Sequence, residues 1–198
     1  RDFFEQFLSK DLSTNLFIPF KNRKVNERYV VFVPGAGANF RRWSPKNFVK
    51  VADFIIQEYN LRIKILGSKN DSKIAEEIIH HSRFPEKIEN LTGNTLINSI
   101  DIIGNSKLLI SNDTGMVHIA AATDTFTLCV SNGNQFGEFH PYPKKISKKI
   151  YYIYPPKIEN EPFEELIKKY SRCSNLDINL ITSEEVIKRF DTLLNSTK

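Results

Sequence analysis

The hydrophobic residues of the chain follow two alternating patterns. Short, nearly continuous apolar runs have the composition of buried strands, and the longer segments between them place an apolar residue at every third or fourth position, as helices do. The strand-like runs are 29–33, 61–66, 88–91, 107–111, 125–130 and 151–154. The helical segments are 45–59, 71–82, 95–103, 116–122, 163–170 and 183–194. This alternation predicts an α/β fold with a doubly wound parallel sheet covered on both faces.

The pattern also predicts how the chain is divided. Residues 1–28 begin with apolar side chains at helical spacing, such as Phe3 and Phe7, and end in a polar run. We interpret them as the end of a preceding domain and a linker. Residues 29–160 form the main domain, and residues 161–198 form helices that pack on it.

Residues suited to capping precede several of the predicted helices. Ser44 stands before Pro45, which is a favourable first helical residue, and Thr95 and Ser183 precede two other helices. We expect each of these hydroxyls to cap its helix.

Composition and charge narrow the class of protein. With 40% hydrophobic and 26% charged residues among 198, the chain is globular, and no apolar run approaches the roughly 20 residues of a membrane-spanning helix. The mixed, acidic start lacks a signal-peptide pattern, and a first residue of Arg1 suggests a piece of a longer protein. Two unspaced cysteines, Cys129 and Cys173, indicate reduced thiols of a cytosolic protein. The net charge of +5 favours anionic partners such as nucleotides, phosphorylated glycans or a lipid surface, without implying nucleic acid.

The stretch from Ser111 to His118 combines a strand end, a glycine and a helix start. Free backbone N–H groups at a helix start attract anions, above all phosphate, so Thr114 and Gly115 are candidates to bind a diphosphate. We expect Gly115 to supply the turn. Asp113 could accept hydroxyls of a sugar or order the turn. His118 lies in the first helical turn, where the alternative is a purely structural histidine.

Three further loops, 34–44, 67–71 and 92–95, should meet this stretch, with loop 131–142 alongside, because ligands of an open parallel sheet bind beyond the carboxyl ends of the strands. Gly35 and Ala36 allow close approach to the backbone, and Arg41 in the same loop could bind a phosphate through its guanidinium. The alternative for that loop is a tight turn with solvated arginines. Asp71 could accept hydrogen bonds from ribose hydroxyls, cap a helix, or do both.

Two other kinds of site match the sequence less well. Asp113-Thr114-Gly115 is also the motif of aspartic proteases, but those enzymes pair two such triplets in a β-rich fold, and here a single triplet leads into a helical segment. The chain has no Asp-x-Asp pair and no His, Cys and carboxylate cluster at metal-ligand spacing. We therefore expect no metal and no other cofactor.

A basic cluster follows the predicted strand 125–130. It consists of Lys144, Lys145, Lys148 and Lys149. We expect either a solvated edge or a surface that attracts an anionic acceptor or lipid.

The motifs of residues 29–143 form an ordered set. They are Pro34-Gly35-Ala36, Arg42-Trp43-Ser44-Pro45, Leu66-Gly67 with Asp71, Asn90-Leu91-Thr92-Gly93 with Thr95-Leu96, and Asp113-Thr114-Gly115 with His118-Ile119-Ala120-Ala121-Ala122. This set resembles glycosyltransferase family 9, the bacterial heptosyltransferases of lipopolysaccharide core assembly and their relatives. The resemblance implies a GT-B fold, made of two Rossmann-like domains, of which this chain is the C-terminal, donor-binding half. It also implies inverting, metal-independent transfer, with the catalytic base on the domain ahead of residue 1.

The resemblance also implies a donor site. Its residues would be Gly35, Ala36, Arg41, Asp71, Asn94, Thr95, Asp113, Thr114, Gly115 and His118. Arg41 and His118 would stabilise the leaving diphosphate. Asp71 would hold the ribose, and Asn94 and Thr95 would lie near the base.

We therefore expect the donor half of a bacterial glycosyltransferase that transfers a heptose-like sugar from a nucleoside diphosphate. The acceptor would be a lipopolysaccharide-type or other cell-surface glycan or glycolipid, reached from the cytoplasm, with peripheral attachment to the inner face of the cell membrane as one option. The fragment alone would be inactive. The alternatives are a non-catalytic nucleotide- or glycan-binding module and a nucleotide-sugar epimerase of the same fold.

Overall fold

The computed structural model describes residues 28–196, and the predicted helix and linker at the start of the chain lie outside this part apart from residue 28. The described residues form one six-stranded sheet in the order β3-β2-β1-β4-β5-β6, and every neighbouring pair is parallel. The strands are β1 (Tyr29–Val33), β2 (Arg62–Ile65), β3 (Ile88–Asn90), β4 (Leu109–Asn112), β5 (Thr127–Val130) and β6 (Ile150–Ile153). This order is that of a doubly wound, Rossmann-like sheet, which confirms the predicted fold class.

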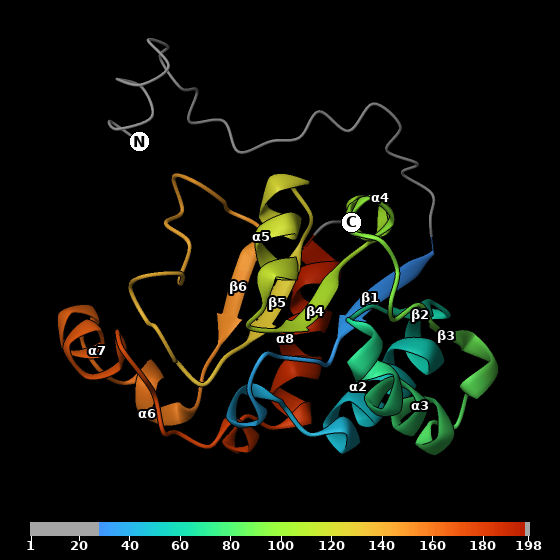
Figure 1. The fold of residues 1–198 in the computed structure, drawn as a ribbon, viewed down its shortest axis with the longest axis horizontal. Helices are drawn as coiled ribbons and strands as arrows, with labels where there is room; N and C mark the ends of the chain where they lie inside the picture. The colour runs from blue at the N-terminus through green and yellow to red at the C-terminus, as the bar shows by residue number, and fades with distance from the viewer. Residues whose placement is uncertain (1–27, 197–198) are drawn as a thin grey trace, which may run out of the picture.

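Helices cover both faces of the sheet (Figure 1). They are α2 (Pro45–Tyr59), α3 (Ser72–His81), α4 (Leu96–Asn105), α5 (Gly115–Ala122), α6 (Pro156–Glu159), α7 (Phe163–Tyr170) and α8 (Ser183–Ser196). The shorter 3-10 turns are η1 (Asn39–Arg41), η2 (Lys69–Asp71), η3 (Pro85–Lys87) and η4 (Ile178–Leu180). The sequence pattern predicts all of the strands and longer helices to within a few residues, but it predicts neither α6 nor the 3-10 turns.

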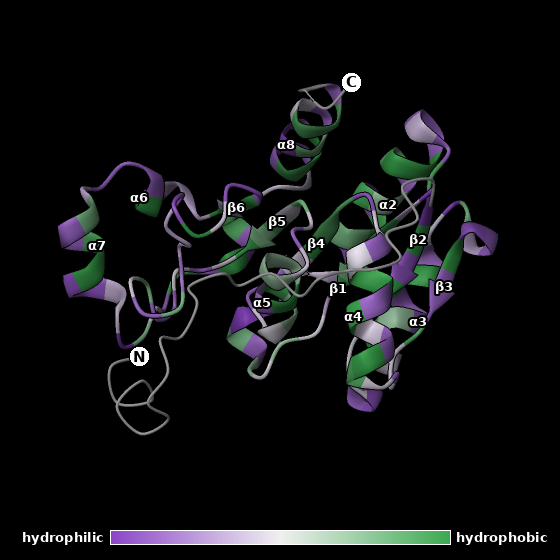
Figure 2. Cartoon of the chain, turned by 90° about the horizontal axis from the view of Figure 1, so that it is seen from above, coloured by the Kyte–Doolittle hydropathy of each residue, from purple (hydrophilic) through white to green (hydrophobic). Residues whose placement is uncertain are grey.

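Two hydrophobic clusters lie on the two faces of the sheet. One joins β-strand residues to α2, α3 and α8 through side chains such as Phe48, Ile78 and Phe190, and the other joins them to α4 and α5 through Ile103 and Val117. Figure 2 shows α8 and α5 on opposite sides of the sheet. Strand residues of β1 are buried throughout, as expected for a central strand with helices on both faces. The division of the chain at residue 160 stays a prediction.

One of the predicted helix caps is wrong, and another lies in place without its capping hydrogen bond. Ser44 occupies the N-cap position of α2, but its side chain makes no capping hydrogen bond. Ser183 is already the first residue of α8, and the hydroxyl of Thr182 accepts the capping hydrogen bond from the N–H of Glu185 at 3.2 Å. Thr95 does cap α4, because its hydroxyl accepts from the N–H of Asn98 at 3.2 Å.

Trp43 ties the loop after β1 to the C-terminal part of the chain. Its side chain is fully buried, packs edge-on against Phe48, and donates its indole N–H to the carbonyl of Ile181 at 2.8 Å. The segment that leads into α8 is therefore fastened to the loop that leads into α2. Both cysteines are free thiols, with Cys129 buried and Cys173 exposed.

Candidate functional site

The sheet changes winding direction between β1 and β4, and this is where ligands of doubly wound folds bind. The fully buried amide of Asn112, the last residue of β4, joins the two loops that leave this point. Its Nδ2 donates to the carbonyl of Pro34 at 2.7 Å, and its Oδ1 accepts from the backbone N–H of Trp43 at 3.2 Å. The start and the end of the loop after β1 are thus held beside the start of α5.

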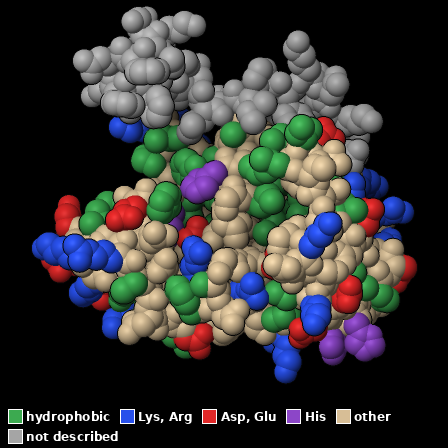
Figure 3. Space-filling view, in the orientation of Figure 1, with side chains coloured by type: hydrophobic (Ala, Val, Ile, Leu, Met, Phe, Trp, Pro, Cys, Tyr) green, Lys and Arg blue, Asp and Glu red, His purple; other side chains and the backbone are tan. Residues whose placement is uncertain are grey.

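A cavity of about 670 Å³ opens beside these loops. Its lining residues are Val33, Gly35, Ala36, Gly37, Arg42, Gly67, Ser68, Asn70, Asp71, Leu96, Thr114, Gly115, Met116 and Ile119. Small residues and hydroxyls form one part of the wall, and Leu96, Met116 and Ile119 form an apolar part. Figure 3 shows hydrophobic side chains gathered over α4 and α5, where Leu96 and Ile97 are 62% and 78% exposed.

A second cavity, of about 240 Å³, adjoins the first. Its lining residues are Gly37, Arg41, Asp113, Thr114, Gly115, His118, Gln135 and Phe139. The two cavities share Gly37, Thr114 and Gly115, so they lie on either side of the start of α5. The larger cavity is in part apolar, whereas the smaller one collects the charged and titratable side chains Arg41, Asp113 and His118.

The two consecutive arginines of the loop after β1 have different roles. Arg42 donates from Nε and Nη2 to the carbonyl of Ala36, at 3.0 and 2.9 Å, so it braces the loop. The Nε of Arg41 is buried and has no hydrogen-bond partner among the described residues. A buried guanidinium nitrogen without a partner is costly, and the side chain that carries it lines the smaller cavity.

Asp71 is buried beside Gly35 and organises the turn after β2. Its Oδ2 accepts from the backbone N–H and the hydroxyl of Ser68 at 2.8 and 2.7 Å, and its Oδ1 lies 3.9 Å from Nη2 of Arg42. It makes no side-chain capping bond to α3. A Cβ added to Gly35 would lie 2.5 Å from its carboxyl carbon, so glycine is required there by close approach.

The start of α5 is built by Thr114 and left open at Gly115. The hydroxyl of Thr114 accepts from the N–H of Met116 at 3.3 Å. Gly115 does not have a left-handed backbone conformation, so the expectation that it supplies the turn is wrong. A Cβ at this position would meet no atom within 4 Å, which leaves the backbone of Gly115 open to a ligand.

Two side chains from the loop between β5 and β6 contact titratable residues of the smaller cavity. The hydroxyl of Tyr142 lies 2.6 Å from Nδ1 of His118, and Nε2 of the buried His140 lies 3.5 Å from Oδ2 of Asp113. His140 also contacts the hydroxyl of Tyr154 through Nδ1 and the carbonyl of Asn134 through Nε2, both at 2.8 Å. Burial lowers the pKa of His140, which favours the neutral ring.

Asn94 and Thr95 do not line either cavity. Both are exposed, and Thr95 is engaged as the cap of α4. Their neighbour Leu96 lines the larger cavity instead. The other sequence-predicted site residues are divided between the two cavities.

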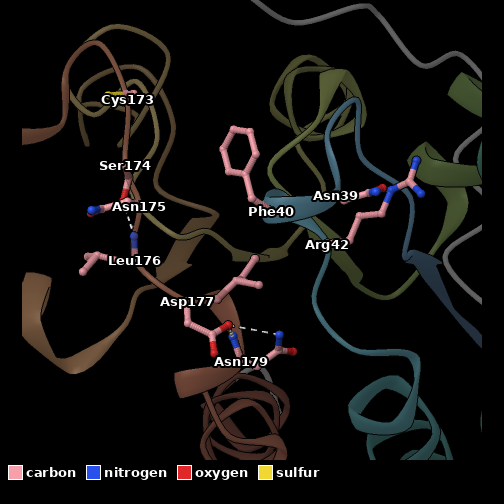
Figure 4. Close-up of a pocket in the computed structure, with 10 residues that line it drawn as sticks. Asn39, Phe40, Arg42, Cys173, Ser174, Asn175, Leu176, Asp177 and Asn179 are labelled. Carbon is pink, nitrogen blue, oxygen red and sulfur yellow. Dashed lines mark hydrogen bonds between the residues drawn. The ribbon is translucent and has the colours of Figure 1, made fainter.

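A third cavity, of about 510 Å³, lies between the loop after β1 and the segment before α8 (Figure 4). Its lining residues are Asn39, Phe40, Arg42, Cys173, Ser174, Asn175, Leu176, Asp177, Ile178 and Asn179. Nδ2 of Asn132 donates to the carbonyls of Phe40 and Leu176, both at 3.3 Å, and so holds the two walls together. None of the predicted site residues lines this cavity.

Metal and membrane features complete the description. Residues 28–196 contain no group of three or more His, Cys, Asp or Glu side chains placed to hold a metal ion. Among the same residues no helix has the length and apolar character needed to cross a bilayer.

Comparison with known proteins places this site in a family. The family model of glycosyltransferase family 9 (heptosyltransferase) matches residues 5–166, which is most of the chain. The chain belongs to glycosyltransferase family 9. The family's motif segments after β1, β2 and β4 thus coincide with the walls of the two adjoining cavities.

The relatives of this family 9 chain are bacterial heptosyltransferases. Lipooligosaccharide heptosyltransferase 2 of Haemophilus ducreyi is 36% identical over 104 residues, which cover 49% of this chain and 29% of that protein. The solved structure of E. coli ADP-heptose lps heptosyltransferase II matches with a TM-score of 0.67 at 21% identity, over 87% of this chain and 48% of that one. The solved structure of a family 9 glycosyltransferase from Veillonella parvula also matches with a TM-score of 0.67. The identity is 19%, and the match covers 97% of this chain and 50% of that one. The chain therefore spans about half the length of these solved relatives, and its fold is one half of a GT-B glycosyltransferase.

Sequence reasoning on this family 9 chain missed several residues that shape the site. The apolar wall made by Met116 and Ile119 lies in the predicted helix itself, and its helical period could have placed it beside Gly115. His140 and Tyr142 lie in a long loop, where no periodicity indicates direction. The order of the predicted strands was their only signal, since the loop after β5 must lie beside the loop after β4.

Proposed function

We propose that this chain is the C-terminal, donor-binding half of an inverting glycosyltransferase that takes a nucleoside-diphosphate heptose. The observation that carries the proposal is the side chain of Arg41, whose buried Nε has no hydrogen-bond partner among the described residues and which lines a cavity that also exposes the start of α5. A guanidinium and the N-terminus of a helix both favour a phosphate group. The larger cavity next to it supplies the room that a nucleoside needs.

The donor would lie across both cavities. The nucleoside would occupy the larger one, with its base against Leu96, Met116 or Ile119 and its ribose near Asp71. The diphosphate would cross the start of α5, where Gly37, Thr114 and Gly115 are common to both cavities. The sugar would then reach the smaller cavity.

Two side chains in the smaller cavity would act on the sugar and the leaving group. Asp113 would accept hydrogen bonds from sugar hydroxyls, and His118 would donate one to a phosphate oxygen. His140 lies behind Asp113 at 3.5 Å and would help to fix its carboxylate.

The reaction would be a single displacement at the anomeric carbon. An acceptor hydroxyl oxygen forms the new bond as the bond from the anomeric carbon to the diphosphate oxygen breaks, and a base on another domain takes the acceptor proton. Arg41 and the start of α5 would stabilise the negative charge that develops on the diphosphate. These groups would supply that stabilisation without a metal ion.

The donor and acceptor classes rest on the relatives. One structural relative is an E. coli heptosyltransferase with ADP-2-deoxy-2-fluoro heptose, which supports ADP-heptose as the donor. The curated relatives are named lipooligosaccharide or lipopolysaccharide heptosyltransferases, which supports a lipid-anchored glycan as the acceptor. The site of action would be the cytoplasm.

Nucleotide titration tests the proposal. Calorimetry of the 198-residue chain with ADP, UDP and GDP should show binding of at least one, and we expect ADP to bind most tightly. Asp113→Ala combined with His118→Ala should weaken this binding. Absence of binding by all three nucleotides would contradict the donor site. Assay of the longer protein, with donor alone and with donor plus acceptor, separates transfer from epimerisation, because an epimerase changes the donor without an acceptor.

The lysine cluster supports a weak attraction to an anionic membrane. Lys144, Lys145 and Lys148 are exposed, and Ile146 between them is 39% exposed. Lys149 does not belong to this surface, because its Nζ lies 2.5 Å from Oδ2 of Asp124. Sedimentation with anionic vesicles should recover more of the chain than sedimentation with neutral vesicles, and a triple Lys→Gln variant should remove the difference.

A further inference from the structure

Two aromatic side chains of the loop between β5 and β6 hold the ring of His118. Tyr142 lies edge-on to it, with ring centroids 5.7 Å apart, and Phe139 lies edge-on at 6.4 Å. His118 is exposed on the outer side of α5, so its helix alone does not fix the ring. The loop therefore fixes the rotation of the imidazole ring, which the helix alone does not fix.

The contact between Tyr142 and His118 also couples the phenol hydrogen to the position of the imidazole hydrogen. The phenol oxygen lies 2.6 Å from Nδ1, and it makes no other hydrogen bond within residues 28–196. Burial raises the pKa of Tyr142, so the phenol keeps its proton. In one of the two possible arrangements the O–H donates to Nδ1, and the hydrogen of the neutral ring is then on Nε2.

We infer that Tyr142 is a positioning residue of the donor site, which holds His118 with an Nε2–H donor directed to the diphosphate side of the smaller cavity. This inference rests on the proposed function. His118 lines the cavity, and Nδ1 is taken by Tyr142, so Nε2 is the ring nitrogen that remains for a ligand.

The direction of the hydrogen matters because phosphate oxygens only accept hydrogen bonds. An Nε2 lone pair would repel them, whereas Nε2–H donates to them. The arrangement also survives protonation of the ring, since Nδ1–H then donates to the phenol oxygen and Nε2–H is unchanged. Tyr142 thus gives His118 the same role toward the diphosphate in both charge states.

Imidazole NMR tests the tautomer directly. In the ¹⁵N-labelled chain at a pH where His118 is neutral, Nδ1 should resonate as an unprotonated nitrogen and Nε2 as a protonated one, with His118→Ala giving the assignment. Tyr142→Phe should shift both resonances toward the average of two tautomers. Tyr151→Phe, on the exposed side of β6, is the matched control and should leave them unchanged. Resonances of His118 that stay the same in Tyr142→Phe would overturn the inference.

A double-mutant cycle on ADP affinity tests the consequence. Tyr142→Phe should weaken ADP binding by about three- to tenfold, the range of one net hydrogen bond. In the His118→Ala background the same substitution should change affinity by less than about twofold, because the group it positions is gone. An equal loss in both backgrounds would show a merely structural role. Thermal unfolding of each variant identifies any that fails to fold, and Phe139→Leu then tests the ring contact while keeping the hydrogen bond.

The proposed function and the role of Tyr142 can fail separately. If the unmodified chain binds none of the nucleotides, the proposed function fails. If it binds ADP and His118→Ala weakens the binding, but Tyr142→Phe does not, only the role of Tyr142 is overturned.

Discussion

Arg41 and Arg42 show how neighbouring residues of one type acquire separate roles. The sequence places two guanidiniums in a loop of small residues, but it does not indicate which of them is free. The structure directs Arg42 back to the carbonyl of Ala36 and leaves Nε of Arg41 buried without a partner among the described residues. Side-chain direction in an irregular loop follows from tertiary contacts, which periodicity does not encode.

Replacement of each arginine by glutamine should separate binding from stability. Arg41→Gln should weaken ADP binding by about 10- to 100-fold, as expected for loss of a charge-assisted hydrogen bond, with little change in melting temperature. Arg42→Gln should instead lower the melting temperature by several degrees, because two hydrogen bonds to Ala36 are lost. Calorimetry and thermal unfolding of both variants check this. A larger affinity loss in Arg42→Gln would reverse the assignment.

Gly35 and Gly115 also have separate roles: close packing requires the first glycine, whereas the second leaves the backbone open to a ligand. A Cβ at position 35 would lie 2.5 Å from the carboxyl carbon of Asp71, which is tied to Ser68, whereas a Cβ at position 115 would meet nothing within 4 Å. Gly35→Ala should therefore destabilise the fold by about 1–3 kcal/mol. Gly115→Ala should keep or raise stability, by up to about 1 kcal/mol, and still weaken ADP binding at least about tenfold. Unaltered ADP binding by a folded Gly115→Ala variant would argue against a diphosphate at this backbone.

At the level of elements, the loop between β5 and β6 is the largest departure from what the sequence predicts. Phe136, His140 and Tyr154 pack together, and His140 reaches Asp113 from behind. The sequence predicts a polar, aromatic loop but not that a histidine within it is fully enclosed. Long loops gain such order from neighbouring elements, here α7 and β6, and not from local propensity.

The enclosed His140 should make stability depend on pH. Burial lowers its folded-state pKa below the unfolded value of about 6.5, so the unfolded chain binds more protons in that region. The stabilising contribution of buried, neutral His140 is fully present above about pH 6.5. It is lost as the pH falls toward the lower pKa that His140 has in the folded state. Denaturant unfolding at pH 7.5 and 5.5 should show this decrease, and His140→Gln should reduce the pH difference while lowering stability at both values. An equal pH difference in the variant would point to another group.

For the whole molecule, the sequence predicted the fold class and the loops whose residues line the two adjoining cavities. Alternating apolar runs and helical segments are repeated, redundant signals, so the parallel sheet and its two covered faces could be predicted, whereas the strand order came from the structure. The motifs after β1, β2 and β4 then meet because parallel strands share one carboxyl edge. Asn94 and Thr95 are the exceptions, since the cap of α4 turns them outward and brings Leu96 to the cavity. Contacts made by long loops, such as that of Tyr142 with His118, could not be predicted from the sequence and are known only from the structure.

The absence of a metal requirement is a prediction for the molecule as a whole. If Arg41 and the start of α5 supply the positive charge that the diphosphate needs, ADP affinity should be the same within about twofold with EDTA and with added Mg²⁺. Calorimetry of the chain in both buffers checks this. A marked gain in affinity with Mg²⁺ would mean that the protein groups do not suffice.

The bond from Trp43 to Ile181 spans 138 residues of sequence. A polypeptide leaves the ribosome from its N-terminus, so the loop after β1 emerges long before the carbonyl that fastens it. Until then the indole N–H lacks its native acceptor, and the sheet face that α8 covers is open. During synthesis the loop after β1 is therefore among the last parts of this chain to be fastened, and a ribosome that stalls before Ile181 leaves a nascent chain without this bond.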